Sequence, residues 1–80
     1  PVKAEIKNFL SAHTGLPADR LTDHLDLFEN DIWDSLLIVR FVKFAEQKFN
    51  LRLDLAALRE EKIKTIEAAV RFLEAASGRA

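Results

Sequence analysis

The sequence predicts an all-α fold: a small four-helix bundle with a long loop between its first and second helices and a short third helix. Apolar residues recur at helical spacing along most of the chain, and alternation typical of a strand appears only over residues 51–53, which is too short for a sheet. Eighty residues with 49% hydrophobic side chains provide one core but not two, so we expect a single domain over residues 1–80. Because the chain has no cysteine, helix packing must stabilise it without disulfides or thiolate-bound metal.

The first helix is predicted over residues 2–14. Its apolar face consists of Val2, Ile6, Phe9, Leu10 and His13. Gly15 and Pro17 follow and end the helix. Because His13 continues the apolar stripe, we interpret it as a residue at the edge of the core or as a capping residue rather than as a catalytic base.

A long connection over residues 15–33 lacks helical periodicity but is rich in apolar side chains. These are Leu16, Leu21, Leu25, Leu27, Phe28, Ile32 and Trp33. A loop this apolar cannot stand free in water, so we expect it to pack across the helices, with Trp33 as an anchor at its end. Long loops in compact domains are often functional.

The second helix is predicted from Asp34 or Ser35, either of which suits the N-cap, to Phe49. On a helical wheel the core-facing arc contains Leu37, Ile38, Phe41, Val42, Phe44, Ala45 and Phe49. Leu36 and Val39 fall instead on the polar arc, beside Ser35. An exposed apolar pair of this kind is typical of a docking surface. Packing of the pair against the preceding loop is the alternative.

The last part of the chain predicts two more helices. Asp54 is expected to cap a short third helix that extends to about Glu60 and is anchored by Leu55 and Leu58. Thr65 is expected to cap the fourth helix, which ends at Ser77-Gly78. The apolar stripe of the fourth helix consists of Ile66, Ala69, Val70 and Leu73.

Charge and hydropathy exclude two classes of partner. Residues 19–34 carry a net charge of −5 and residues 35–64 a net charge of +3. The acidic segment would repel a phosphate backbone, and no stripe of Lys and Arg interleaved with aromatics is evident, so we expect no nucleic-acid partner. The longest apolar run spans only residues 36–39, and no signal-like segment is evident, so we expect no membrane insertion and a cytoplasmic protein.

The sequence also argues against a catalytic or metal site. His13 and His24 are the only side chains with an ordinary pKa near neutrality, and neither has a spacing that pairs it with a serine nucleophile. His24 stands near Asp23 and Asp26 without the spacing of a metal-ligand set. We therefore expect a protein that is not an enzyme.

Ser35 allows two interpretations. Serine is a favoured N-cap, and the adjacent Asp34 suits the positive end of the helix dipole, so both residues have a structural explanation. Free amides at the same helix end also favour an anion, which is compatible with a phosphodiester on the Ser35 hydroxyl.

Three segments together carry a resemblance to a known family. Asp26-Leu27-Phe28-Glu29 precedes Asp34-Ser35-Leu36 at the start of the second helix, and Ile63-Lys64-Thr65-Ile66 opens the fourth. In these segments the chain resembles, over nearly its whole length, the phosphopantetheine-dependent acyl and peptidyl carrier proteins. The resemblance implies that Ser35 is esterified by 4′-phosphopantetheine from coenzyme A, and that the thiol of this arm holds the cargo as a thioester.

The resemblance also implies roles for the neighbouring residues. Asp34 would help to orient the complex with a phosphopantetheinyl transferase. The surface that partner enzymes read would consist of Leu36, Val39, Arg40 and Lys43. The other implied partners are an acyl- or amino-acid-activating ligase and a downstream acyl transferase, condensing or modifying enzyme, and the carrier itself is expected to be a monomer.

The charge of the second helix differs from that of fatty-acid-synthase carriers, whose second helix is strongly acidic. Here Arg40, Lys43 and Lys48 stand against Glu46. This difference favours a free-standing carrier in a specialised biosynthetic pathway, similar to aminoacyl, peptidyl or D-alanyl carriers or to carriers of unusual acyl units. The alternative is an unmodified helical adaptor that docks a partner through Leu36 and Val39.

Overall fold

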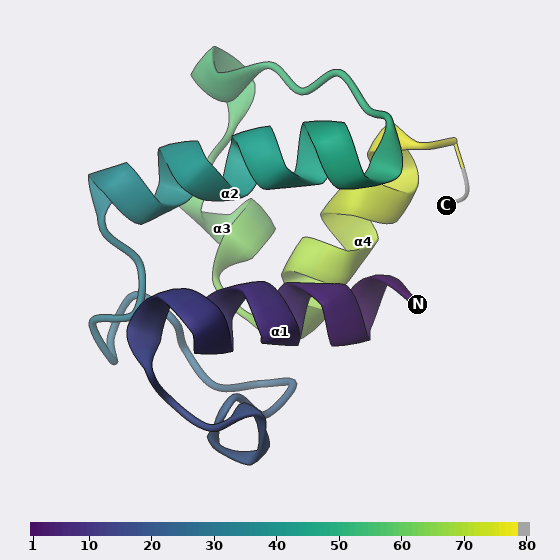
Figure 1. The fold of residues 1–80 in the computed structure, drawn as a ribbon. Helices are drawn as coiled ribbons and strands as arrows, with labels where there is room; N and C mark the ends of the chain where they lie inside the picture. Colours follow the sequence, from purple (N-terminus) through teal and green to yellow (C-terminus); the bar gives the residue numbers. More distant parts are fainter. Residues whose placement is uncertain (79–80) are drawn as a thin grey trace.

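The computed structural model describes residues 1–78, and within them the fold is all-α (Figure 1). Four α-helices follow one another: α1 (Val2–Thr14), α2 (Ser35–Phe49), α3 (Glu60–Ile63) and α4 (Ile66–Ala76). Two short 3₁₀ turns lie between them, η1 (Ala18–Arg20) and η2 (Leu55–Ala57). The predicted four-helix bundle with a long first connection is confirmed.

The ends of α1 and α4 agree with the sequence-based boundaries. Gly15 adopts the left-handed conformation (φ 78°), and its amide donates to the carbonyl oxygen of Ser11, which ends α1. The Thr65 hydroxyl accepts a 3.0 Å hydrogen bond from the amide of Ala68 and caps α4. Helix propensity and capping, both local signals, therefore account for these two helices.

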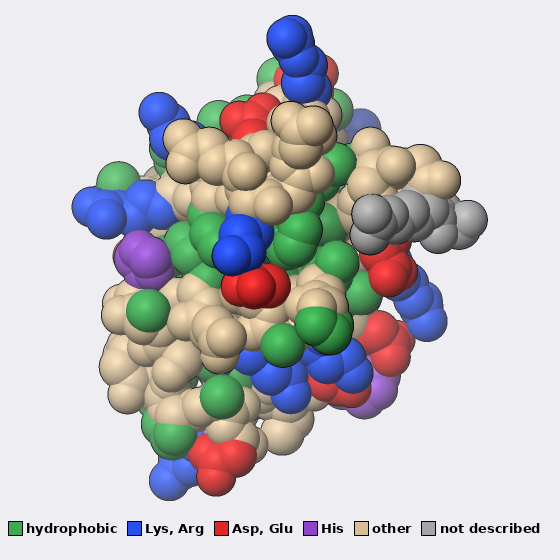
Figure 2. All heavy atoms as spheres, turned by 45° about the vertical axis from the view of Figure 1, so that its right-hand side comes forward, with side chains coloured by type: hydrophobic (Ala, Val, Ile, Leu, Met, Phe, Trp, Pro, Cys, Tyr) green, Lys and Arg blue, Asp and Glu red, His purple; other side chains and the backbone are tan. Residues whose placement is uncertain are grey.

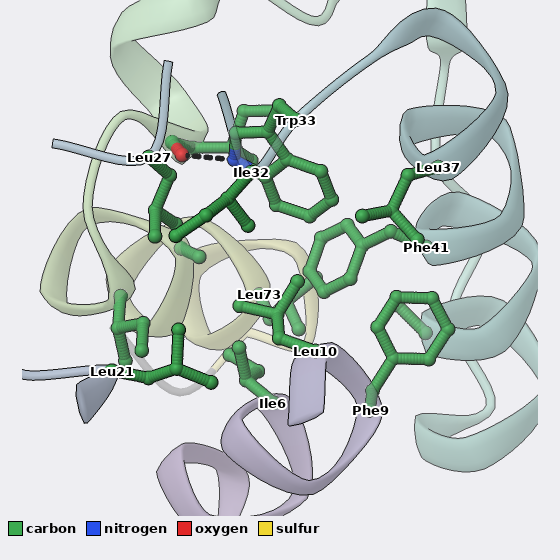
Figure 3. Packing of buried hydrophobic residues seen from close by; sticks show 14 residues of the cluster. Ile6, Phe9, Leu10, Leu21, Leu27, Ile32, Trp33, Leu37, Phe41 and Leu73 are labelled. Atoms are coloured by element: carbon green, nitrogen blue, oxygen red, sulfur yellow. Dashed lines mark hydrogen bonds between the residues drawn. The ribbon is translucent and has the colours of Figure 1, made fainter. Parts of the chain in front are cut away.

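An aromatic cluster joins α1 to α2 at the centre of the bundle (Figure 3). The ring of Phe9 from α1 lies 5.7 Å from that of Phe41 and 4.7 Å from that of Phe44, both from α2. Trp33, just before α2, meets Phe41 edge-on at 5.2 Å. Ring pairs at such distances add stabilisation beyond the burial of their area.

The long connection between α1 and α2 packs against the helices, as predicted. Leu21 and Leu27 are fully buried, and Ile32 and Trp33 nearly so. The amide of Leu27 donates a 2.8 Å hydrogen bond to the carbonyl oxygen of Lys64, which ties the loop to the junction of α3 and α4. The loop is therefore part of the core rather than a flexible link.

The prediction for the third helix was wrong in position. Asp54 does act as a cap, accepting a 3.0 Å bond from the amide of Ala56, but the segment it opens is only the turn η2, and α3 begins at Glu60. Between them Leu58 and Arg59 have extended backbone. A continuous helix would place Ile63 about 140° around the axis from Leu58. The extended break lets Leu58 and Ile63 both pack on the core, whereas Leu55, expected to anchor the helix, stays 46% exposed.

Within residues 1–78, no helix is both long and apolar enough to cross a lipid bilayer.

Candidate functional site

Asp34 is the residue that caps α2. Its backbone is extended (φ −134°, ψ 174°), and its Oδ1 accepts a 2.8 Å hydrogen bond from the amide of Leu37. Its carbonyl oxygen accepts the first helical bond, from Ile38. Of the two residues that sequence left open as the cap, the structure assigns Asp34, and Ser35 becomes the first residue of the helix.

The Ser35 hydroxyl is therefore not used by the fold. Ser35 is exposed, and among residues 1–78 its side chain makes no hydrogen bond, because Asp34 already performs the capping. The amides of Ser35 and Leu36 stand in the first turn, where a helix offers them no acceptor. A free hydroxyl beside amides that favour a negative charge is suited to carry a phosphodiester.

Trp33 positions this helix start. Its indole Nε1 donates a 2.7 Å hydrogen bond to the carbonyl oxygen of Ile63, and its own amide donates to the carbonyl oxygen of Leu27 at 3.1 Å. The prediction of a packing anchor is confirmed, since Trp33 is only 6% exposed. The hydrogen bond to Ile63 was not predicted, although a buried indole N–H generally needs an acceptor.

The segment before the site is a compact turn built by Asp26. Its Oδ1 accepts from the amides of Phe28 (3.0 Å) and Glu29 (2.9 Å), and its other oxygen lies 3.7 Å from the ammonium of Lys64. The amide donors, Glu29 first, hold the pKa of Asp26 below its ordinary value, and Lys64 acts in the same direction. The turn closes at Asp31, which adopts a left-handed backbone (φ 57°).

The outer face of α2 is apolar at two positions and basic at two more. Leu36 is 62% exposed and Val39 37%. Arg40 and Lys43 are also exposed, and within the described part of the chain neither makes an ion pair. Lys48 instead lies 3.5 Å from Glu5 of α1, and Glu46 accepts a bond from the amide of Leu53. The unpaired positive charge of α2 is thus concentrated at Arg40 and Lys43.

On the face shown in Figure 2, Lys and Arg side chains and Asp and Glu side chains are both scattered over the surface, and hydrophobic side chains gather near its centre.

Among the hydrogen bonds of residues 1–78, neither histidine is bonded to Ser35. The ring of His13 lies 4.3 Å from that of Phe9 in a tilted arrangement, and its Nδ1 donates to the carbonyl oxygen of Phe9 at 3.0 Å, which suits the predicted place at the core edge. His24 lies 3.6 Å from a carboxylate oxygen of Glu67. Across residues 1–78, no group of three or more His, Cys, Asp or Glu side chains is arranged to hold a metal ion.

Comparison with known proteins identifies the family. A family model described as the phosphopantetheine attachment site matches residues 4–73. No solved structure gives a significant match to the chain. Domains of this family attach 4′-phosphopantetheine, and the exposed serine at the start of α2 fits such a group. The chain belongs to the phosphopantetheine attachment-site family and is a phosphopantetheine-carrying carrier protein.

Proposed function

We propose that Ser35 carries the 4′-phosphopantetheine group and that this chain delivers an acyl or aminoacyl cargo to partner enzymes. The observation that carries the proposal is the exposed Ser35 hydroxyl, which has no structural role although it stands at a helix start where an anion is favoured. When bound, the group supplies a terminal thiol on which the cargo is held as a thioester. The chain's own residues position that group and present it to partners.

Asp34 has a positioning role in this proposal. Its hydrogen bond to the amide of Leu37 holds the carboxylate directly beside Ser35. A phosphopantetheinyl transferase that approaches Ser35 therefore meets a carboxylate in a defined place, which helps to orient the complex.

We propose that the partner enzymes contact a docking face on α2. This face consists of Leu36, Val39, Arg40 and Lys43. Its exposed apolar side chains provide area to bury, and its two unpaired cations favour partners with acidic surfaces. The partners by class are the transferase, an activating ligase and a downstream acyl transferase, condensing or modifying enzyme. A basic docking face supports a free-standing carrier in a specialised pathway rather than a fatty-acid-synthase carrier.

We propose a monomer that works in the cytoplasm. Among the described residues, the large hydrophobic side chains that are exposed are Leu36, Val39 and Leu55. Three such side chains give too little apolar area for a stable homodimer. Sedimentation equilibrium should therefore report the monomer mass.

The unmodified adaptor remains the competing function, because exposure of Leu36 would serve an adaptor equally well. Membership of a family that attaches phosphopantetheine favours the carrier.

Covalent modification distinguishes the two. Incubation with coenzyme A and a broad-specificity phosphopantetheinyl transferase should add one phosphopantetheinyl group, measured by intact-mass spectrometry, and Ser35→Ala should abolish the addition. Ser11→Ala and Ser77→Ala are matched controls, since these hydroxyls donate to the carbonyl oxygens of Leu16 and Glu74. Modification at either control residue, or none with several active transferases, would refute the carrier.

The linkage of the cargo tests the second half of the proposal. After loading by candidate acyl- or amino-acid-activating ligases, neutral hydroxylamine should release the cargo and restore a free thiol. Cargo that resists hydroxylamine is not held as a thioester, and the proposed delivery function would then be wrong.

A further inference from the structure

A groove of about 420 Å³ lies between the C-terminal end of α1 and the N-terminal end of α2. The residues that line it are His13, Thr14, Asp31, Ile32, Asp34, Leu36, Leu37 and Arg40. Asp34 and Leu36 are the chain neighbours of Ser35, so the groove begins at the proposed attachment residue.

We propose that the pantetheine part of the arm on Ser35 folds into this groove, toward α1. The inference rests on the proposed function, since it requires the arm to be attached at Ser35. The volume lies within the range of about 300–1,000 Å³ that small-molecule sites have.

The lining matches the chemistry of pantetheine, which has a geminal dimethyl group, a hydroxyl and two amides. Leu36 offers an exposed apolar surface for the methyl groups. The carboxylates of Asp31 and Asp34 can accept hydrogen bonds from the hydroxyl and the amide N–H groups, and Arg40 can donate to an amide carbonyl.

His13 contributes a further acceptor. Because its Nδ1 donates to the carbonyl oxygen of Phe9, the neutral ring carries its proton there and leaves Nε2 as an acceptor. The same bond and the contact with the Phe9 ring favour one orientation of the imidazole at the edge of the groove. A fixed ring loses little freedom when it binds the arm.

The other hollows near the site are less suited to the arm. A pocket of about 90 Å³ between α2 and the η2–α3 segment, lined by Phe28, Ile38, Leu58 and their neighbours, is too small for pantetheine. The bond from Trp33 to Ile63 ties the start of α2 to α3 beside this pocket.

A third hollow, of about 440 Å³, lies between the turn at Asp26 and α3. Its lining includes one ammonium group, that of Lys64, and four carboxylates, those of Asp26, Glu29, Glu60 and Glu61. Neither chain neighbour of Ser35 lines it. Its lining therefore does not continue from the attachment residue, whereas that of the groove does. Size and proximity to Ser35 together favour the groove toward α1.

The groove is an open surface feature rather than an enclosed cavity, so a docked arm can leave it. We therefore expect the arm to exchange between the groove and solvent, which is compatible with delivery to partner enzymes.

The test uses holo-protein prepared with carbon-13-labelled pantetheine. Mass spectrometry first confirms that the group is on Ser35; a failure here refutes the proposed function and not the groove. In the holo-protein, nuclear Overhauser contacts should join the geminal methyls to Leu36 and His13. The apo-to-holo change in amide chemical shift should be larger at Thr14 and Arg40 than at Phe28 and Leu58.

Variants then test whether the arm docks in the groove rather than on another side of α2. His13→Ala and Arg40→Gln should each lower the ratio of docked to undocked arm by about fivefold, the factor that the loss of about 1 kcal/mol gives. Leu55→Ala, which changes the pocket toward α3, is the matched control and should leave the contacts unchanged. The melting temperature confirms that each variant is folded.

Two results would overturn the inference. One is a set of contacts from the arm to Phe28, Leu55 or Leu58 instead of to His13 and Leu36. The other is an arm with order parameters below about 0.6 throughout and no contacts to the groove, which would describe an arm free in solvent.

Discussion

The indole Nε1 of Trp33 donates a 2.7 Å hydrogen bond to the carbonyl oxygen of Ile63, and through it the residue two positions before Ser35 is joined to the last residue of α3. Both residues are almost completely buried. In such surroundings an unpaired polar group costs more than the bond contributes, so this contact helps to hold the start of α2 against α3.

Trp33→Phe should destabilise the fold by about 1–3 kcal/mol, because it leaves the carbonyl oxygen of Ile63 without this donor and removes part of a buried ring. Urea unfolding followed by circular dichroism measures the loss. Since Asp34 still caps α2, Ser35 should still be modified by the transferase. A loss below about 0.5 kcal/mol would show that the bond adds nothing beyond an ordinary surface contact.

Asp34 and Ser35 should separate stability from modification. Asp34→Ala removes the capping oxygen and should cost about 0.5–2 kcal/mol, whereas Ser35→Ala, at an exposed residue that caps nothing, should stay within about 0.5 kcal/mol. Asp34→Asn keeps a capping oxygen and serves as the control. Thermal unfolding of the three variants measures these changes in stability. If Ser35→Ala lost as much stability as Asp34→Ala, the assignment of Asp34 as the cap would be wrong.

Val39→Asp should weaken loading or transfer by a partner enzyme with little change in melting temperature, since Val39 lies on the exposed face of α2. Phe41→Asp is the control. Phe41 is fully buried between Phe9 and Trp33, so a carboxylate there should unfold the domain. If Val39→Asp unfolded the protein and Phe41→Asp did not, the assigned orientation of α2 would be wrong.

Lys43→Glu should slow association with a partner that presents acidic groups, and the effect should shrink as salt rises, because exposed charges act mainly on encounter rates. Arg40→Glu should show the same salt dependence together with an effect on the arm, since Arg40 also lines the groove and Lys43 does not. Stopped-flow association at several ionic strengths measures both. Faster association of the reversed variants with enzymes that have basic docking patches would instead indicate a fatty-acid-synthase carrier.

Acid should loosen the turn before the site. The pKa of Asp26 is lowered in the folded protein, chiefly by the amide of Glu29, so its carboxylate stabilises the fold above the unfolded pKa, and this contribution is lost as the pH falls through the folded pKa. The pH range in which this stabilisation is lost therefore lies below about 4. Asp26→Asn should be less stable than the parent at neutral pH and should lose less stability on acidification, as measured by denaturant unfolding at each pH. Asp19→Asn, at an exposed loop residue, is the matched control and should change neither value.

Most of the fold could be predicted because its signals are local. The apolar stripes of α1, α2 and α4, the left-handed Gly15 and the Thr65 cap each depend on residues within about one or two helical turns. The short third helix was misplaced for the opposite reason. The extended break at Leu58 and Arg59 exists because Leu58 and Ile63 must both reach a core built by distant segments, and no local signal encodes that requirement.

The candidate site divides in the same way. The sequence by itself determined that an Asp-Ser-Leu triplet opens an amphipathic helix with an apolar pair on its polar face. Only the tertiary structure decided that Asp34 rather than Ser35 is the cap, because both residue types suit the position and the extended backbone of Asp34, with helical backbone from Ser35 onward, chooses between them. The groove beside Ser35 likewise required the structure. It forms where the end of α1 meets the start of α2, and the aromatic contacts of Phe9 with Phe41 and Phe44 hold the two helices together across residues far apart in the chain.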